Sequence, residues 1–410
     1  MPGADVDVLV VGAGPAGIAA ALTARRAGLT LRCIDRAAFP RDKTCGDGLT
    51  ATALRDLETL GVEVPRLAGS QPVDSVVLRG PTGRDVTLRL PGDGHRAVVV
   101  SRLELDAALV ARARGEGVEV VERSPVREVL VTRQSVLVTH GDGEITSARF
   151  LIAADGHYST VRRLTEPDTP TDLGSWHAFR QYFRGVGDRR LWVLFEPDLL
   201  PGYAWVFPLP DGRANVGFGV LRDLGPGGPA LAARWRDLLA RPTLRSVLGP
   251  DAEPEARHRA WPIPARFDPR RTAGGRVLYA GDAAGVVDPL TGEGIAQALR
   301  TGMLAAEAIA AGGPAAAVAA RHRRGVATAL GCDLRFASVL QHVLATRAGA
   351  RGVLALVDSS EWTRRNFARW MFEDYPRAQL LTPRRWARGA LTPPGAFRAP
   401  DAAVVDPGST

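Results

Sequence analysis

Lysine and cysteine are both scarce in this sequence. Of its 52 lysine and arginine residues only Lys43 is a lysine, a bias typical of GC-rich coding sequences, which makes this lysine a candidate for chemistry of its own. The three cysteines, Cys33, Cys45 and Cys332, are too few and too scattered for a disulfide framework or a zinc cluster. We therefore expect a reducing, cytoplasmic setting and no metal site.

Long apolar runs are also missing. No uninterrupted apolar segment reaches 18 residues, and the N-terminal apolar run is broken by glycine and proline without a preceding basic segment. These absences predict neither a membrane-spanning helix nor a signal peptide. The formal net charge of +8 suits anionic lipid surfaces, acidic partners or phosphorylated substrates. We do not expect a nucleic-acid partner, because basic clusters with interleaved aromatic residues are absent.

The stretch from Val8 to Asp35 is the most informative part of the chain. It contains a buried-type strand, a glycine turn, a helix, a second strand and an acid, namely Val8–Val11, Gly12-x-Gly14-x-x-Gly17, Pro15–Arg26, Leu29–Ile34 and Asp35. Such a turn lets a pyrophosphate approach the helix N-terminus, and the third glycine lets helix and strand pack closely. The terminal carboxylate is placed to bind a ribose. The stretch therefore predicts dinucleotide binding.

The remaining pattern predicts an α/β protein with a Rossmann-like nucleotide-binding domain, an inserted antiparallel sheet and a C-terminal helical segment. Residues 39–50 are predicted as a loop, 75–90 as a hairpin, and Ser101 as the N-cap of a helix that ends near Arg114. Between about Thr171 and Pro264 we expect an antiparallel meander. The predicted division assigns 1–70, 97–165 and 270–320 to the nucleotide domain, 71–96 and 166–269 to the substrate domain, and 321–410 to a helical region with a flexible end.

Three further motifs follow predicted buried strands. They are Ala154-Asp155-Gly156, Gly281-Asp282-Ala-Ala-Gly285 and Pro289-Leu-Thr-Gly292-Glu-Gly294-Ile295. An acid at the end of a parallel strand can face a cofactor cleft, and the glycines of the third motif open a helix whose N–H groups can face an anion. Each motif alone is more often a simple turn, but their order and type favour a site.

Together these pieces resemble the FAD-binding signature of the para-hydroxybenzoate hydroxylase-like flavoproteins. Within that superfamily the first 320 or so residues most resemble the geranylgeranyl reductase family. The segments that carry this likeness are Pro40–Gly48, which includes Lys-Thr-Cys-Gly, Tyr203-Ala-Trp205-Val-Phe207-Pro208, and Asp288–Gly294.

The resemblance implies an FAD site. It assigns Asp35 to the adenosine ribose, Arg102 to the ribityl–pyrophosphate region and Asp282 to the pyrophosphate or ribitol. Backbone N–H groups of Gly292–Ile295 would face the flavin ring. The full set of implied cofactor-binding residues is Gly12, Gly14, Pro15, Ala16, Gly17, Asp35, Arg36, Lys43, Cys45, Gly46, Arg102, Val126, Asp155, Gly156, Gly281, Asp282, Pro289, Gly292, Gly294 and Ile295.

The resemblance also implies a substrate wall formed by Tyr203, Trp205 and Phe207, although each could equally be ordinary sheet core. Cys45 would lie near the flavin, where the adjacent Lys43 would lower its pKa; it could deliver a proton, gate the flavin or only fill space. Lys43 itself could form an ion pair, contact a phosphate or be exposed. The implied reaction is reduction of an isolated C=C bond of a prenyl chain on a lipid or quinone, with the proton supplied by water, Cys45 or Tyr203.

An alternative on the same scaffold is a monooxygenase or dehydrogenase acting on an aromatic or polyketide-like compound. The sequence lacks the Trp-x-Trp-x-Ile-Pro motif of flavin-dependent halogenases, which argues against halogenation. It also lacks a second Gly-x-Gly-x-x-Gly after a strand, so we expect NAD(P)H to bind transiently or a partner protein to donate electrons.

The C-terminal segment leaves two interpretations open. Between Arg321 and Arg398 fourteen arginines stand against five acidic residues, interleaved with Trp362, Phe367, Trp370, Met371, Phe372 and Trp386. Such a segment can lie on an anionic membrane, which suits a prenyl-lipid substrate, or it can cap the substrate domain.

Overall fold

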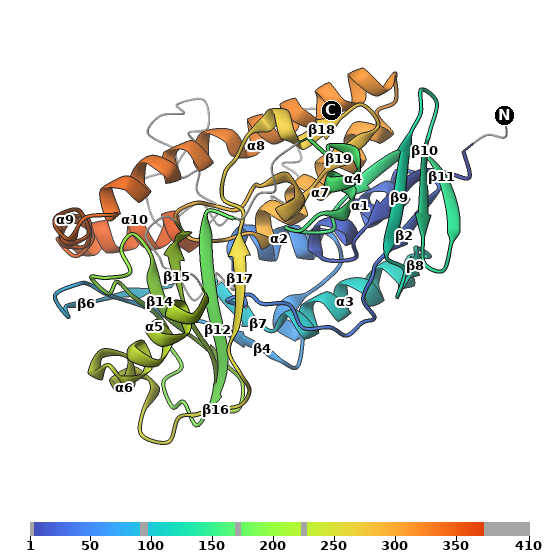
Figure 1. Cartoon of the computed structure of the whole chain (residues 1–410). Helices are drawn as coiled ribbons and strands as arrows, with labels where there is room; N and C mark the ends of the chain where they lie inside the picture. Colours follow the sequence, from blue (N-terminus) through green and yellow to red (C-terminus); the bar gives the residue numbers. More distant parts are fainter. Residues whose placement is uncertain (1–3, 91–96, 169–173, 223–227, 373–410) are drawn as a thin grey trace, which may run out of the picture.

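The computed structural model of the chain describes residues 4–90, 97–168, 174–222 and 228–372. Two large sheets lie side by side, and long C-terminal helices extend from the first sheet to the second (Figure 1). The expected α/β architecture, with a Rossmann-like sheet, an antiparallel sheet and C-terminal helices, is confirmed.

The first sheet has eight strands and a parallel centre. Its main path is β18 (Ala273–Gly274), β19 (Val277–Tyr279), β11 (Glu144–Ala153), β1 (Val6–Val11), β2 (Leu31–Ile34) and β8 (Glu119–Val121). The antiparallel strands β10 (Val136–His140) and β9 (Val126–Val131) extend it from β11. Val8, Leu9 and Val10 are fully buried, as a parallel strand covered on both faces requires.

Helices pack on both faces of this sheet. α1 (Pro15–Arg26), α3 (Arg102–Gly115) and α7 (Ile295–Ala310) share one core cluster with it, and α4 (Thr160–Thr165) and the 3-10 helix η4 (Gly281–Ala284) share the other. The helix α2 (Ala51–Thr59) packs against α7, and the short 3-10 helices η1 (Val64–Arg66) and η3 (Pro269–Thr272) lie in the connections. The Ser101 hydroxyl accepts a hydrogen bond from the Glu104 N–H, so the predicted N-cap of α3 is confirmed. Helices α1 and α7 approach so closely that a Cβ on Gly302 would lie 2.0 Å from the Ala16 carbonyl oxygen.

The second sheet is mostly antiparallel and also has eight strands. Its path is β16 (Glu253–Pro254), β12 (Trp176–Arg184), β15 (Arg213–Leu221), β14 (Tyr203–Leu209), β13 (Leu191–Leu194), β5 (Ser75–Arg79) and β6 (Asp85–Arg89), with β17 (Arg259–Ile263) paired to β12. The predicted hairpin at 75–90 is thus present as β5–β6, and β5 joins β13 in a parallel pair. A small third sheet contains β3 (Gly48–Thr50), β7 (Ala97–Val100) and β4 (Ser70–Pro72).

Two expectations were incomplete. The segment predicted as a strand meander also contains α5 (Gly228–Ala240) and α6 (Pro242–Leu248), which pack on the sheet through Leu231, Trp235 and Leu244. The predicted loop at 39–50 ends in strand β3, because Gly48–Thr50 pairs with β7.

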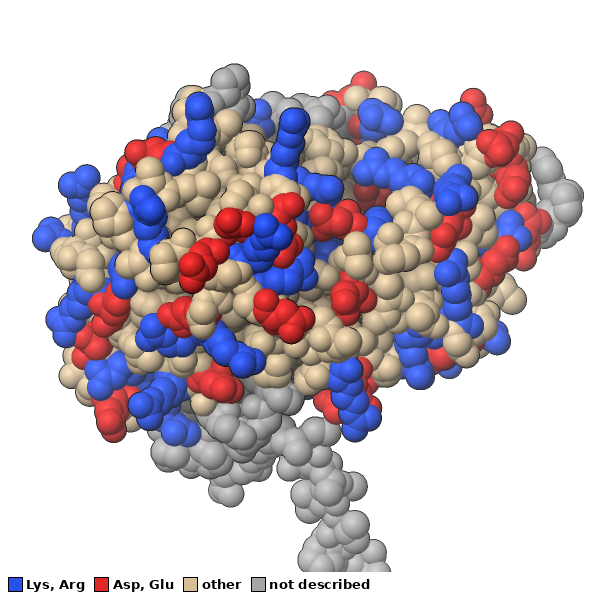
Figure 2. All heavy atoms as spheres, turned by 90° about the horizontal axis from the view of Figure 1, so that it is seen from below, with Lys and Arg blue, Asp and Glu red and all other residues tan. Residues whose placement is uncertain are grey.

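The C-terminal helices are α8 (Ala315–Leu344), α9 (Arg347–Val357) and α10 (Glu361–Phe372). Leu354, Val357 and Ala368 pack in one cluster with Val76 and Leu88 of the second sheet. Within the described ranges no helix is long and apolar enough to cross a membrane. Basic and acidic side chains are interspersed over the face of the molecule shown in Figure 2.

Candidate active site

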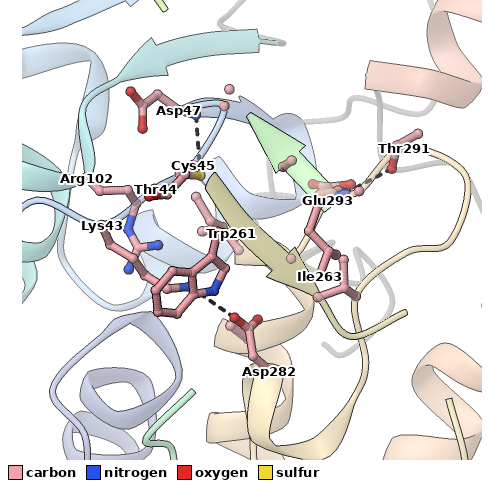
Figure 3. A pocket seen from close by; sticks show the side chains of 18 of the residues that line it. Lys43, Thr44, Cys45, Asp47, Arg102, Trp261, Ile263, Asp282, Thr291 and Glu293 are labelled. Atoms are coloured by element: carbon pink, nitrogen blue, oxygen red, sulfur yellow. Dashed lines mark hydrogen bonds and ion pairs between the residues drawn. The ribbon is translucent and has the colours of Figure 1, made fainter. Parts of the chain in front are cut away.

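One large cavity of about 690 Å³ extends from the glycine turn after β1 to the C-terminal helices. One end is lined by Gly14, Asp35 and Arg102, and the other by residues such as Leu344, Val353 and Trp370. Part of the cavity is shown in Figure 3, where Arg102, Cys45, Trp261 and Asp282 surround one space. The cavity therefore joins a polar part and an apolar part in one space.

The glycine turn forms the floor of the polar end. Gly14 is the N-cap of α1, and a Cβ added there would lie 3.4 Å from Arg41 Nη2, so a guanidinium lies directly above the helix N-terminus. The carboxylate of Asp35 accepts hydrogen bonds of 2.7 Å from the N–H groups of Ala13 and Ala37. Gly17 lies behind the cavity wall, where a Cβ would be 1.7 Å from the Gly12 carbonyl oxygen. Its predicted packing role is confirmed by that contact.

Two arginines converge above this turn on one buried carboxylate. Arg102 binds Asp106 through two hydrogen bonds of 2.8 and 2.7 Å, and Arg41 Nη1 lies 3.1 Å from the same carboxylate. Asp106 is fully buried, and Arg102 is 4% exposed. Burial disfavours the charged guanidinium, but Asp106 outweighs that effect and raises the pKa of Arg102. The two guanidiniums and one carboxylate leave net positive charge beside a helix N-terminus, which suits an anion. The sequence motifs indicated Arg102 but missed Arg41.

Lys43 is not an exposed loop lysine. Its ammonium lies 3.0 Å from the Asp282 carboxylate and 5.9 Å from the centre of the Trp261 ring (Figure 3). Burial alone would raise the pKa of Asp282, but the Lys43 ammonium holds it below its usual value. Of the interpretations considered for Lys43, the ion pair is the one the structure contains.

The other acid motif, Asp155-Gly156, also lines the polar end. The Asp155 carboxylate accepts hydrogen bonds from the Ser159 hydroxyl at 2.6 Å and the Val161 N–H at 3.0 Å. It therefore stabilises the start of α4 while it faces the cavity. Burial raises the pKa of Asp155, and these hydrogen bonds oppose that shift.

The turn before α7 closes the cavity from a third side. Asp288 Oδ1 accepts hydrogen bonds from the N–H groups of Leu290 and Thr291, at 2.9 and 2.8 Å. Gly294 is the N-cap of α7 and has no side-chain capping bond, so the N-terminus of this helix opens toward the cavity. Gly292 and Ile295 line the cavity, whereas Pro289 lies behind its wall.

The expected thiolate character of Cys45 is wrong. Lys43 is engaged with Asp282, and the groups that dominate around the thiol are buried surroundings and the nearby Asp47 carboxylate. Burial and Asp47 raise the pKa of Cys45, so the thiol is protonated at neutral pH. The Asp47 N–H donates to the sulphur at 3.4 Å.

The three aromatic residues of β14 line the cavity together. Tyr203 and Trp205, and Trp205 and Phe207, have ring centroids 6.1 Å apart. The Tyr203 hydroxyl donates a hydrogen bond to the Thr291 carbonyl, which links the sheet to the turn before α7. These residues form an aromatic wall beside Cys45.

Comparison with known proteins identifies the family. The FAD binding domain family matches residues 5–186. The chain is 35% identical over 333 residues to a menaquinone reductase of Mycolicibacterium smegmatis, covering 75% of this chain and 77% of that protein. It is 33% identical over 320 residues to digeranylgeranylglycerophospholipid reductase 1 of Methanopyrus kandleri, covering 74% and 80% respectively. The chain belongs to the geranylgeranyl reductase family.

A solved structure agrees with this assignment at the level of the fold. A geranylgeranyl bacteriochlorophyll reductase-like protein from Thermoplasma acidophilum superimposes with a TM-score of 0.77 and 22% identity, over 92% of this chain and 98% of that one. A flavin-dependent brominase also has this fold, with a TM-score of 0.73 and 20% identity over 92% and 97% of the two chains. The chain is an FAD-dependent oxidoreductase of the geranylgeranyl reductase type.

The residues of the polar end fit FAD. Positive charge from Arg41 and Arg102 above the N-terminus of α1 suits a pyrophosphate, and the buried carboxylate of Asp35 at the end of β2 suits a ribose. All the cofactor-binding residues expected in this family member line the cavity except Gly17 and Pro289.

The apolar end was not anticipated from the family motifs. Its lining from the C-terminal helices consists of Leu340, Leu344, Ala350, Val353, Leu354, Phe367, Trp370 and Met371. Phe367, Trp370 and Met371 were noted only as part of an aromatic, basic tail; they face the cavity, which favours the capping interpretation for α10. Trp362 is 57% exposed, and Trp386 lies outside the described residues. In the sequence, the one pattern that could have indicated this apolar end was the spacing of Phe367, Trp370 and Met371, which places them on one helix face.

Proposed function

We propose that this protein reduces an isolated C=C bond of a prenyl chain carried by a lipid or quinone. The observation that carries this proposal is the continuity of the cavity, which passes from the FAD-type end, past Cys45 and Trp205, into a space lined by α8, α9 and α10. Relatives named for menaquinone and digeranylgeranylglycerophospholipid support it, because both names denote prenyl-bearing lipids.

The residues of the polar end would hold FAD, which, when bound and reduced, supplies the hydride. We propose that Arg102, Arg41 and the N-terminus of α1 bind its pyrophosphate and Asp35 its adenosine ribose. Gly292–Ile295, at the open N-terminus of α7, would stabilise negative charge at the ring. The polar end thus binds and orients the cofactor.

The chain's own residues then place the substrate and a proton. Trp205, Phe207 and the apolar lining of α8–α10 would orient the prenyl chain and exclude water from it. Cys45 is the preferred proton donor because its raised pKa keeps the S–H intact at neutral pH. The Tyr203 hydroxyl already donates its proton to Thr291, which makes it the second choice.

We propose that electrons come from NAD(P)H bound transiently or from a reduced partner protein, since the sequence holds one strand–glycine turn–helix fingerprint. We also propose peripheral membrane contact by the C-terminal helices. Their outer surface exposes Val339 (64%), Leu356 (66%) and Trp362 (57%), and nine arginines stand against three acids over residues 321–372.

Anaerobic single turnover tests the reaction. The FAD-loaded protein is reduced with dithionite and mixed with a menaquinone bearing an unsaturated side chain, or with a digeranylgeranyl lipid in detergent. A product heavier by two hydrogens, formed more slowly by a Cys45→Ala variant, is expected. No mass gain on any prenyl substrate would refute the proposal. Substrate-stimulated oxygen uptake with a product heavier by one oxygen would instead select the monooxygenase alternative.

A further inference from the structure

Asp47 occupies an unusual position between Cys45 and the antiparallel sheet. Its side chain is fully buried, and its backbone is in the left-handed region with φ of 66°. Its backbone ties the loop to the small sheet, because the Asp47 carbonyl accepts the Val100 N–H at 3.0 Å. Such a conformation is rare for a residue other than glycine, although aspartate and asparagine tolerate it. A charged group in this setting needs a reason beyond turn formation.

The Asp47 carboxylate is held from two strands of the second sheet. Its Oδ2 atom accepts a 2.6 Å hydrogen bond from the Tyr182 hydroxyl on β12 and a 2.7 Å bond from Asn215 Nδ2 on β15. The Arg180 guanidinium lies 4.1 Å from the centre of the Tyr182 ring and 2.7 Å from the Asp42 carboxylate. The loop from Asp42 to Asp47 is therefore fixed to the sheet at both ends.

Asn215 connects this loop to the aromatic wall. Its Nδ2 also donates to the Cys45 carbonyl at 2.8 Å, and its Oδ1 accepts the indole N–H of Trp205 at 3.0 Å. An indole N–H only donates and a carbonyl only accepts, so the orientation of the amide is determined by its partners. Asn215 is fully buried, so no bulk water competes for these bonds.

We propose that Asp47 is a positioning residue that, through Asn215, fixes the Cys45 thiol and the Trp205 ring relative to each other. The Asp47 N–H donates to the Cys45 sulphur, so the sulphur acts as acceptor toward the loop and its own hydrogen is left to the cavity. This inference rests on the proposed function in one respect only: the thiol and the ring matter because they would meet the prenyl chain.

The same carboxylate sets the charge beside the thiol. Burial raises the pKa of Asp47 to about 6, against the opposing effects of the Tyr182 hydroxyl, the Arg180 guanidinium, the Asn215 amide and the Arg102 guanidinium. The group is therefore ionised at pH 8 and largely protonated at pH 5. Its negative charge opposes formation of a Cys45 thiolate, whereas the positive charges of Arg102 and Lys43 favour it. Removal of that charge should make Cys45 more reactive above pH 6 and have little effect below it.

The test measures alkylation of Cys45 by N-ethylmaleimide in the FAD-loaded protein, in a Cys332→Ser background, by peptide mass mapping. In Asp47→Asn, which keeps the left-handed backbone acceptable, we expect a rate at pH 8 raised about 3- to 10-fold and a difference that disappears at pH 5. Asp47→Gly removes the side chain without straining the backbone and should raise the rate as well. Asp56→Asn is the matched control, since Asp56 is buried, has a pKa raised to about 6 and does not line the cavity.

If Cys45 is alkylated at the same rate in Asp47→Asn as in Asp56→Asn at every pH, the inference is overturned. It is also overturned if the faster alkylation in Asp47→Asn persists unchanged at pH 5. Neither variant requires substrate in this assay, so absence of prenyl reduction would refute the proposed function and leave the Asp47 result standing. If the proposed function holds, Asp47→Gly should lower kcat at least 10-fold with FAD retained, and Asp47→Asn should recover part of it. Equal kcat in Asp47→Gly and the parent protein would count against positioning.

Discussion

The two ends of the cavity are formed by different kinds of chemical group. The polar end consists of backbone, helix N-termini and paired charges such as Arg102–Asp106, held by contacts closer than a methyl group allows. The apolar end consists of side chains from three separate helices, among them Leu344, Val353 and Phe367. Fixed dipoles and buried charges tolerate little displacement, whereas apolar side chains can repack around a changed volume. A substitution should therefore abolish cofactor binding at one end and change substrate preference at the other.

The largest effect should follow loss of the Arg102 guanidinium. Arg102→Met leaves the fully buried Asp106 without its bidentate partner, which costs about 3–5 kcal/mol of unfolding free energy. Arg41→Met should cost less, since Asp106 then keeps Arg102. Urea unfolding and FAD absorbance after gel filtration measure both. Equal stability of the two variants would contradict this account.

The addition of a single methyl group at the glycine turn should destabilise the protein nearly as much as the loss of the Arg102 guanidinium. In Gly17→Ala the new Cβ would lie 1.7 Å from the Gly12 carbonyl, so α1 must move away from β1. We expect about 3 kcal/mol of destabilisation and loss of bound FAD. Gly28→Ala, a glycine with open space around it, is a control for the substitution itself, with strain at its positive φ as its only cost. Retention of FAD by the Gly17 variant would show that the polar end is less rigid than described.

A substitution at the apolar end should weaken substrate binding and leave FAD binding unchanged. Phe367→Ala removes a ring that lines the cavity and lies 5.5 Å from the Trp370 ring, so prenyl binding should weaken by about 1 kcal/mol, or fivefold in KM. FAD content should stay at the parent level. The measurement is the KM of the Phe367→Ala variant and of the parent protein for a series of substrates with increasing prenyl-chain length. A fall in FAD content instead would mean that the two ends are not separable.

The smallest expected effect is on the pH dependence of the unfolding free energy. Burial raises the pKa of Asp56 to about 6, outweighing Arg300. A carboxyl group with a raised folded-state pKa contributes stability that is full below its unfolded pKa near 4 and is lost as the pH rises through 6. Between pH 5 and 7 the parent should therefore lose about 1 kcal/mol more than Asp56→Asn. Parallel pH profiles of unfolding free energy for the two proteins would contradict the raised pKa.

The same contrast explains what the sequence could predict. The polar end is encoded in contiguous motifs whose glycines and acids follow buried strands, so Gly12–Asp35, Asp155 and Gly294 could be placed in advance. Arg41 could not, because its role depends on the approach of α3 to the glycine turn. Lys43 misled because its ammonium does lower the pKa of Cys45, as expected, but burial and the Asp47 carboxylate outweigh it. The main partner of that ammonium is Asp282, 239 residues away.

The antiparallel sheet and the apolar end were only partly predictable for a related reason. Leu231, Trp235 and Leu238 have helical spacing, which could have indicated α5, but the surrounding alternating strands dominated the interpretation. Trp370 and Phe367 occupy one face of a helix, and nothing in a single helix tells whether that face meets a sheet, a membrane or a ligand. Only the packing of α10 on the second sheet decides between them.

The contact between Gly302 and Ala16 has a consequence for the size of ligand that the protein accepts. Two helices that open toward the cavity, α1 at Gly14 and α7 at Gly294, are locked together by a backbone approach with no room for a side chain. The distance between their N-termini is therefore fixed. A ligand with negative charge at two places that far apart can contact both N-termini, whereas a mononucleotide, which reaches only one of them, should lose the second contact.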